Sequence, residues 1–347
     1  MGVTLAVDGM GGDNAPQMVV DGLALAAIRY PATSFMLFGD APTLSALVAL
    51  HPQLKDHVTI IHTDEVVTSE MKPSAAIRGL PNSSMRLAIK AVSEGKAQGV
   101  VSAGNTGAYM ALAKMILKTL PGIERPALAS LVPTLRSESV MLDLGANVEC
   151  TAQNLEQFAL MGMMFARYVL SLSKPTVGVL NVGSEEMKGI PYVKEAADLI
   201  RKSSVGDAFH GFIEGDDITK GTVDVVVTDG FTGNIVLKAG EGVMQMAMTY
   251  VREGFKNSFF ASLGYLLARP MLEKLKARLD HRRYNGGIWL GLNGVAIKSH
   301  GGTDALGFSH AIALAIDMVT SGVNDHIREE FQIEEASQIS PKKKAIK

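Results

Sequence analysis

The sequence has little of several things, and each shortage excludes a class of protein. Cys150 is the sole cysteine in 347 residues, so the chain can form neither an internal disulfide nor a thiolate metal cluster. The formal net charge of -2 gives no indication of nucleic-acid binding. Apolar runs are short, because the most apolar stretch, 159–172, is interrupted by Arg167 and falls below the ~20 residues that span a bilayer.

Several catalytic signatures are also missing. The sequence contains no G-x-S-x-G elbow, no H-E-x-x-H and no Walker A motif, and no base accompanies Cys150. Gly9, Gly11 and Gly12 do not satisfy G-x-G-x-x-G, and the acids beside them would repel a pyrophosphate. These absences argue against covalent catalysis, ATP use and nicotinamide binding. We therefore expect neither a cofactor nor a metal.

What is present is a 47% hydrophobic content, ample for a sizeable core, arranged as short apolar strands between helical patterns. Strands are predicted at 3–7, 34–40, 57–64, 99–102, 129–132, 140–144, 175–181, 208–214 and 223–228. Helices are predicted at 17–29, 84–97, 108–120, 154–171, 192–202, 232–250 and 309–321, with a polar loop at 71–85. This order predicts an α/β protein with a largely parallel sheet covered on both faces. Its functional site should lie at the carboxyl ends of the strands.

Turns rich in Gly, Asn and Asp follow many of these strands, and SAGNTGA at 102–108 has the clearest chemical logic. Gly104 and Gly107 let the backbone approach a ligand, and Asn105 and Thr106 add donors. The helix that follows directs its positive end at the same point, which favours an anion. DGFTGN at 229–234 repeats the arrangement with Gly233 and Asn234. The alternative for both turns is ordinary helix capping.

Other polar residues could serve the same anion site. Asp8, Asp13 and Asn14 could orient a ligand or another residue, or simply hydrogen-bond within their turn. The remaining candidates are cations, hydroxyls and a histidine: Lys72, Arg78 and Ser84 for phosphate, Lys188 for an oxyanion, and His300 with Lys298 for acid–base work or charge. The alternatives are an ordinary surface loop for Lys72, Arg78 and Ser84, a surface ion pair for Lys188 and a structural role for His300.

The interval 252–283 differs from the rest, because apolar residues recur there at helical spacing beside an excess of basic residues. The contact candidates are Phe259, Phe260, Leu263, Leu266, Leu267, Arg269, Lys274 and Arg278. Such a segment suits an oligomer contact, a membrane surface or an acidic partner protein. A core-packed helical pair with a solvated charged face would look the same.

The motifs in this order closely resemble those of the bacterial phosphate acyltransferases of phospholipid synthesis. The match rests on VDGMGGDNAP, KPSAAIRGLPNSSM, SAGNTGA, RPA, LDLGAN, NVGSEEMKG, DGFTGN and YNGGIWLGLNGVAIKSHG, and it runs from residue 7 to about 301. The resemblance implies a three-layer α/β/α, Rossmann-like fold related to phosphotransacetylases. It also implies transfer of a long fatty acyl chain from acyl carrier protein to inorganic phosphate, giving an acyl phosphate for phosphatidic acid synthesis.

We therefore expect a single catalytic domain at 1–335, with a projecting amphipathic helical pair at 252–285 and a polar basic tail at 336–347. Expected partners are acyl carrier protein, phosphate and a second copy of the chain, with no nucleic acid. The expected location is the cytoplasm, and contact with the inner face of the cell membrane and with the downstream glycerol-3-phosphate acyltransferase stays open. The catalytic candidates are Lys188, Asn105, His300 and Asn234. Two alternatives are a short-chain phosphotransacetylase that uses acyl-coenzyme A and a membrane-docked interaction protein without catalysis.

Overall fold

The computed structural model describes residues 2–256, 259–278 and 281–344. The strands are β1 Thr4–Asp8, β2 Ser34–Gly39, β3 Val58–His62, β4 Gly99–Ser102, β5 Ala127–Pro133, β6 Glu138–Leu142, β7 Val177–Leu180, β8 Phe209–Ile213, β9 Val225–Val227, β10 Gly287–Leu290 and β11 Val295–Lys298. The α-helices are α1 Gln17–Arg29, α2 Ala41–Val48, α3 Pro73–Gly79, α4 Ser84–Ser93, α5 Thr106–Leu117, α6 Ala152–Tyr168, α7 Pro191–Lys202, α8 Gly215–Lys220, α9 Gly230–Lys256, α10 Phe259–Arg278, α11 Ala305–Ser321 and α12 Val323–Lys344. A 3-10 turn, η3, spans His281–Tyr284.

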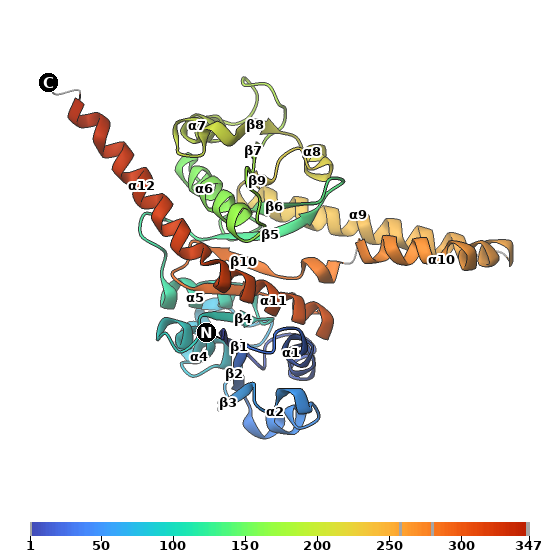
Figure 1. Cartoon of the computed structure of the whole chain (residues 1–347). Coiled ribbons are helices and arrows are strands. Elements are labelled where there is room, and N and C mark those ends of the chain that lie inside the picture. Colours follow the sequence, from blue (N-terminus) through green and yellow to red (C-terminus); the bar gives the residue numbers. More distant parts are fainter. Residues whose placement is uncertain (1, 257–258, 279–280, 345–347) are drawn as a thin grey trace.

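The strands form one 11-stranded sheet in the order β3-β2-β1-β4-β11-β10-β5-β6-β9-β7-β8 (Figure 1). The strands from β3 to β11 are mutually parallel, and so are those from β6 to β8. Three antiparallel pairings, β11 with β10, β10 with β5 and β5 with β6, join these two parallel halves. The two halves therefore run in opposite directions along one sheet.

Alternation along the strands assigns each side chain to one of two covered faces. Leu5 and Val7 of β1 belong to a large cluster with α1, α6, α7, α11 and α12. Ala6 between them points the other way, into a cluster with α4 and α5. In the second half that opposite face packs on α8 and the first turns of α9. The result is a three-layer α/β/α arrangement, as the strand–helix order predicts.

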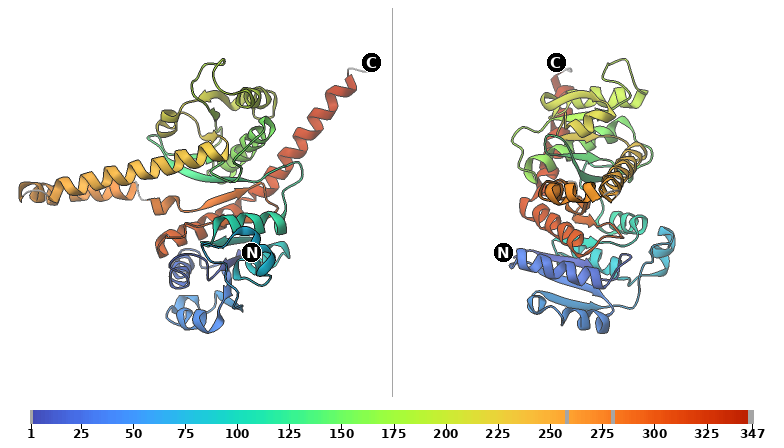
Figure 2. Two further views of the ribbon diagram at one scale, coloured as in Figure 1. Left: turned by 180° about the vertical axis from the view of Figure 1, so that it is seen from behind. Right: turned by 90° about the vertical axis from the view of Figure 1, so that its right-hand side faces the viewer.

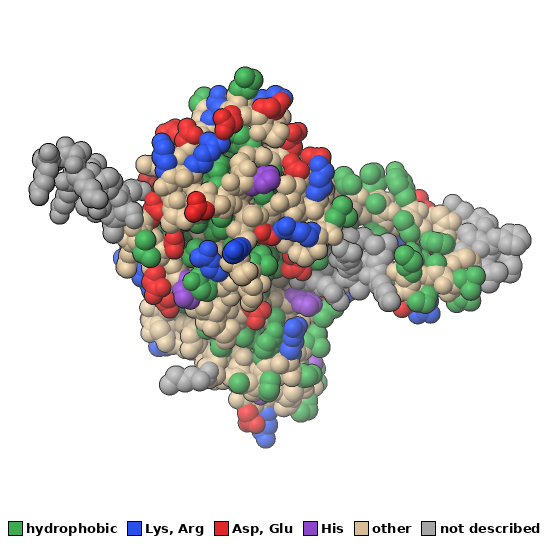
Figure 3. Space-filling model, turned by 45° about the horizontal axis from the view of Figure 1, so that its top comes forward, with side chains coloured by type: hydrophobic (Ala, Val, Ile, Leu, Met, Phe, Trp, Pro, Cys, Tyr) green, Lys and Arg blue, Asp and Glu red, His purple; other side chains and the backbone are tan. Residues whose placement is uncertain are grey.

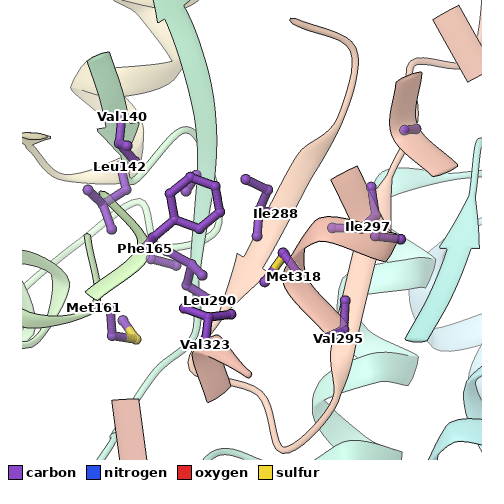
Figure 4. Close-up of a cluster of buried hydrophobic side chains, with 14 of the residues drawn as sticks. Val140, Leu142, Met161, Phe165, Ile288, Leu290, Val295, Ile297, Met318 and Val323 are labelled. Atoms are coloured by element: carbon purple, nitrogen blue, oxygen red, sulfur yellow. The ribbon is translucent and has the colours of Figure 1, made fainter. Parts of the chain in front are cut away.

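The large cluster is continuous across the junction between the halves (Figure 4). Leu142 of β6 and Phe165 of α6 come from one half, Ile297 of β11 from the other, and Ile288 of β10 lies between them. All four side chains are fully buried. Since each buried aliphatic or aromatic side chain contributes roughly 1.5–3 kcal/mol, this shared core holds the halves in a fixed relation.

The long helices α9 and α10 pack on each other and extend together away from the sheet (Figures 1 and 2). The first helix of this pair, α9, begins in the core at Gly230 and is uninterrupted to Lys256, so it joins the helix predicted at 232–250 to the start of the segment expected at 252–285. The side chains of Phe259, Phe260, Leu263, Lys274 and Arg278 lie outside the described residues. Among the described helices, none alone has the length and apolarity to cross a membrane, but the bent pair Ala305–Ser321 with Val323–Glu334 has them.

Several segments have structure that the sequence did not predict. The polar loop at 71–85 contains α3, whose first residue is Pro73. The tail expected at 336–347 is helical as far as Lys344, as the continuation of α12. The short elements β10, β11, α2 and α8 were not predicted, because each is too short to show a clear period in the sequence, and the long helix α12 was not predicted either.

Candidate functional site

Three polar side chains form a row across the carboxyl ends of β1, β4 and β11. Lys298 pairs in register with Ser102, and Asp8 follows the registered pair Val7 and Val101. Alternation directs all three toward the face covered by α4 and α5, because the residues two positions earlier, Ala6, Val100 and Ala296, pack there. The parallel sheet thus brings together three polar groups from distant parts of the sequence, and we call Asp8, Ser102 and Lys298 the Asp8 row.

Asp8 is buried, 1% exposed, at the β1 end of this row. Its carboxylate accepts hydrogen bonds from the Ser84 hydroxyl at 2.6 Å, the Ser102 hydroxyl at 2.7 Å and the Met10 N–H at 3.3 Å. Burial raises the pKa of Asp8, while these bonds and the charge of Lys298 act in the opposite direction. Ser84 begins α4, so Asp8 also fixes where that helix starts.

Lys298 is the buried cation of the row, with 8% of its surface exposed. Its ammonium donates to the main-chain carbonyl of Ala103 at 3.2 Å and to that of Ser299. Burial lowers its pKa to about 8, while Asp8 and Asp13 act to raise it. A pKa of about 8 leaves the side chain mostly cationic at pH 7, so the row holds a positive charge at the sheet edge.

His300 lies in the turn that connects β11 to α11. Its Nδ1 accepts a hydrogen bond from the Gly302 N–H at 3.1 Å, so Nε2 carries the proton of the neutral ring. Partial burial lowers its pKa, and the charges of Lys238 and Lys298 lower it further. At neutral pH the imidazole is therefore uncharged, with its Nε2–H available to donate.

Glycines bring the turns after β1, β4 and β11 into close contact. A Cβ on Gly11 would stand 2.8 Å from the Gly104 nitrogen and 2.4 Å from the Asp8 carboxylate, so only glycine fits there. The Asp13 N–H donates to the Gly301 carbonyl at 2.9 Å, and the Asn14 side chain donates to the Thr303 carbonyl at 3.4 Å. These contacts assemble three turns into one wall beside Lys298 and His300.

The SAGNTGA turn forms the next part of this wall. Asn105 caps α5 by accepting from the Ala108 N–H at 3.0 Å, and its amide donates to the carbonyls of Thr68, Ser69 and Met71. Its side chain therefore anchors the 68–71 segment over the start of the helix. Thr106, beside it, is exposed, and Gly107 lies against Pro73.

The cations expected in the 71–85 segment lie on α3. Lys72 precedes the helix and Arg78 is in its last turn, and both are exposed. Because α3 packs on α5, these cations lie on an element next to the Asn105 turn. Nothing in the described contacts ties either side chain to Asp8 or Lys298.

A second group of polar residues lies at the carboxyl ends of β6 and β9. Asp143 is fully buried and accepts from the N–H groups of Leu128, Ala146 and Asn147 and from the Asn147 amide. Asp229 caps α9 by accepting from the Thr232 N–H at 2.9 Å. These residues are structural, and they fix the start of α9.

Two catalytic candidates from the sequence lie in this second region. Asn234 is exposed on the first turns of α9 near Gly145, and Gly233 packs directly on the Asp143 backbone. Lys188 is exposed in the turn after β7 and pairs with Glu185 at 3.0 Å. No described contact joins Lys188 or Asn234 to the Asp8 row, so their catalytic role stays a prediction.

The projecting helix α9 links the two regions. Lys238 and Glu241 on α9, an ion pair at 2.8 Å, both act electrostatically on His300. Residues not singled out from the sequence include Ser102 and Asn285, although both stand inside quoted motifs. The alternation of β4 could have identified Ser102 as a side chain facing Asp8.

Two other residue groups do not support catalysis. Burial raises the pKa of the Cys150 thiol to about 12, with Asp143 adding to the effect, so the thiolate is scarcely populated at neutral pH. Asp40, His62 and Asp64 bring ligand atoms within 4.8 Å of one another at the surface. However, Asp40 caps α2 and the His62 Nδ1 accepts from the Ala41 N–H at 3.1 Å, so this group is already engaged structurally.

Comparison with known proteins agrees with this fold. Residues 3–326 match a family model described as "Fatty acid synthesis protein". Among solved structures, a phosphotransacetylase from Streptococcus pyogenes superposes with a TM-score of 0.63 at 17% identity, covering 92% of this chain and 94% of that one. The EutD phosphotransacetylase from Staphylococcus aureus gives 0.59 at 17% identity, with the same coverage. These likenesses show the fold.

Relatives of similar length carry the family assignment. The phosphate acyltransferase of Rhodospirillum rubrum is 57% identical over 95% of this chain and 94% of its own. That of Paramagnetospirillum magneticum is 53% identical over 98% of this chain and 97% of its own. With the family model and these relatives spanning nearly its whole length, the chain belongs to the phosphate acyltransferases, enzymes that transfer an acyl group to phosphate.

Proposed function

We propose that the chain transfers a long-chain fatty acyl group from acyl carrier protein to inorganic phosphate by direct attack of phosphate on the thioester. A phosphate oxygen forms a bond to the thioester carbonyl carbon, the carbon–sulfur bond breaks, and the carrier leaves as its thiolate. The products are an acyl phosphate and the free carrier thiol. No acyl-enzyme forms, which fits the high pKa of Cys150.

The observation that carries this proposal is the buried, cationic Lys298, which lies at the β11 end of the Asp8 row and next to the His300 turn. Phosphate is already a nucleophile, so the protein has to hold it, offset its charge and stabilise the oxyanion that develops on the thioester. Lys298 offsets the charge of phosphate, and the glycine-rich turns let main-chain N–H groups approach it. The Nε2–H of neutral His300 donates to the developing oxyanion.

The sequence candidates have different parts in this proposal. Asp8 and Ser84 hold the row and the start of α4, and Asn105 shapes the start of α5 so that Thr106 and the nearby N–H groups face the ligand. Lys188 and Asn234, from the second half, would bind the thioester or the phosphate of the carrier arm. If the Asn105→Ala and Lys188→Ala variants fold and turn over normally, the parts proposed here for Asn105 and Lys188 are wrong.

The projecting pair is the proposed contact for the carrier or the membrane. Leu266 is 61% exposed and Leu267 79% exposed on α10, and Arg269 beside them pairs with Glu273 at 2.8 Å. Apolar side chains gather along this projection (Figure 3). Exposed leucines next to basic residues suit the inner face of a membrane, so we propose peripheral attachment there. A homodimer and contact with the downstream glycerol-3-phosphate acyltransferase belong to the same proposal.

A donor comparison tests the proposal. Purified protein is given phosphate and hydroxylamine with palmitoyl-acyl carrier protein, palmitoyl-coenzyme A or acetyl-coenzyme A, and both free thiol and hydroxamate are measured. We expect equal amounts of thiol and hydroxamate, formed fastest from the palmitoyl carrier and unaffected by free coenzyme A. Preference for acetyl-coenzyme A, with competition by coenzyme A, would instead identify a short-chain phosphotransacetylase.

A further inference from the structure

Asn285 connects the base of the projecting pair to the His300 turn. It follows η3, which the chain enters from α10, and it precedes β10, one of the strands that join the two halves. The side chain is only 9% exposed. A buried amide has to find partners for its donors and its acceptor, so its contacts show what it holds in place.

All the described contacts of this amide are with the turn at 299–303. Its Nδ2 donates to the Ser299 hydroxyl at 2.9 Å and to the Thr303 hydroxyl at 3.3 Å. Its Oδ1 accepts from the main-chain N–H of His300 at 2.9 Å. Asn285 therefore holds both ends of the turn and the backbone of the histidine between them.

The turn has little freedom to find another arrangement. A Cβ on Gly307 would stand 2.1 Å from the Thr303 hydroxyl and 3.3 Å from the Asn285 amide, so α11 packs tightly against this junction. Arg282 of η3 adds a second connection through its ion pair with Asp304, which caps α11. With its backbone held by Asn285 and its Nδ1 by the Gly302 N–H, the imidazole of His300 has a defined direction.

We propose that Asn285 is a positioning residue for phosphate acyl transfer, acting by fixing the His300 turn. The proposal rests on the role given to His300 in the proposed function. It assigns no contact between Asn285 and the substrate. It predicts that losing the amide costs turnover through the placement of His300, since small displacements of a catalytic group are expensive.

Three variants and two readouts test this inference. Asn285→Ala removes all three hydrogen bonds. Asn285→Asp keeps the acceptor for the His300 N–H, and the Ser299 and Thr303 hydroxyls can turn to donate to it. Asn293→Ala is the matched control, because Asn293 is an exposed asparagine between β10 and β11 at the opposite edge of the sheet. The readouts are kcat with palmitoyl-acyl carrier protein and the pKa of His300 by NMR of histidine labelled at Cε1.

The expected results separate positioning from stability. Asn285→Ala should lower kcat about 10- to 100-fold with little change in the KM for phosphate, and the pKa of His300 should rise toward its ordinary value. Asn285→Asp should recover most of the turnover and raise the pKa of His300 by about one unit, because a negative charge then joins the Lys298, Lys238, Glu241 and Asp13 charges around it. Asn293→Ala should change neither readout.

Two results would overturn the inference: turnover of Asn285→Ala within about twofold of the unchanged enzyme, or an unchanged His300 resonance and pKa in both Asn285 variants. If Asn285→Ala does not fold, Asn285→Leu, which keeps the side-chain volume and removes all three hydrogen bonds, replaces it in both readouts. A separate variant tests the proposed function itself. If His300→Ala turns over normally, the role of His300 is wrong, while the NMR readout still shows whether Asn285 positions the imidazole.

Discussion

At the scale of single residues, the proposed anion site depends most on Lys298. A lysine with 8% of its surface exposed loses most of its hydration, so its charge is retained only because main-chain carbonyls and two aspartates compensate. The desolvated cation then interacts with an incoming anion more strongly than an exposed lysine would. The same burial makes its charge sensitive to mildly alkaline pH.

The first prediction follows from the direction of that shift. The cationic form, which we propose binds phosphate, predominates below the pKa of about 8, so kcat/KM for phosphate should fall as the pH rises through about 8. In the Lys298→Arg variant the arginine stays charged at every pH measured, so the alkaline limb, the fall in kcat/KM at high pH, should disappear, even if the rate is lower. Initial rates from pH 6 to 10 measure both enzymes. An alkaline limb at the same pH in the arginine variant would show that another group titrates.

Cys150 gives a second prediction at this scale. Its thiol donates to the Asn147 carbonyl at 3.6 Å and burial raises its pKa to about 12, so very little of the nucleophilic thiolate is present at neutral pH. Cys150→Ser should keep kcat within about twofold of the unchanged enzyme. A loss of several orders of magnitude in this folded variant would favour a covalent acyl-enzyme.

At the scale of elements, α9 is anchored in the core by its first turn and packs on α10 in the projecting pair. Gly233 packs so closely on the Asp143 carbonyl that a Cβ would stand 1.9 Å from it, whereas a Cβ on Gly240 would meet nothing within 4 Å. Gly233→Ala should therefore destabilise the protein by about 1–3 kcal/mol. Gly240→Ala should stabilise α9 by about 0.5–1 kcal/mol, because glycine is a poor helix former. Urea unfolding of the two variants measures both effects, and equal effects would contradict this account of how α9 is anchored.

The elements also show how far the sequence can predict this structure. Helix α1 has the predicted bounds, because its apolar spacing and Pro16 mark it clearly. The short strands β10 and β11 were missed, although β11 places Lys298 next to Ser102. Lys298 and His300 could be named as candidates because they stand in a glycine-rich turn. Their relation to Asp8 could not be predicted, since strand order depends on contacts between segments far apart in the sequence.

At the scale of the whole molecule, the projecting pair exposes apolar side chains that are not part of the hydrophobic core. Leu266→Ser with Leu267→Ser should weaken binding to anionic lipid vesicles by at least about tenfold, because each buried leucine contributes roughly 1.5–3 kcal/mol. Leu50→Ser, a leucine 69% exposed on the main body, is the control. Vesicle sedimentation measures binding, and transfer from palmitoyl-acyl carrier protein without vesicles shows whether the same leucines also contact the carrier. Unchanged sedimentation of the double variant would remove α10 as the membrane contact.

The most direct measurement of the central claim is thiol release from palmitoyl-acyl carrier protein at enzyme concentrations close to that of the substrate, with and without phosphate. Direct attack predicts no release in the absence of phosphate and one thiol for each acyl phosphate in its presence. A burst equal to the enzyme concentration without phosphate would reveal an acyl-enzyme, and continued release without phosphate would reveal thioester hydrolysis. Either result would contradict direct attack by a phosphate held beside Lys298.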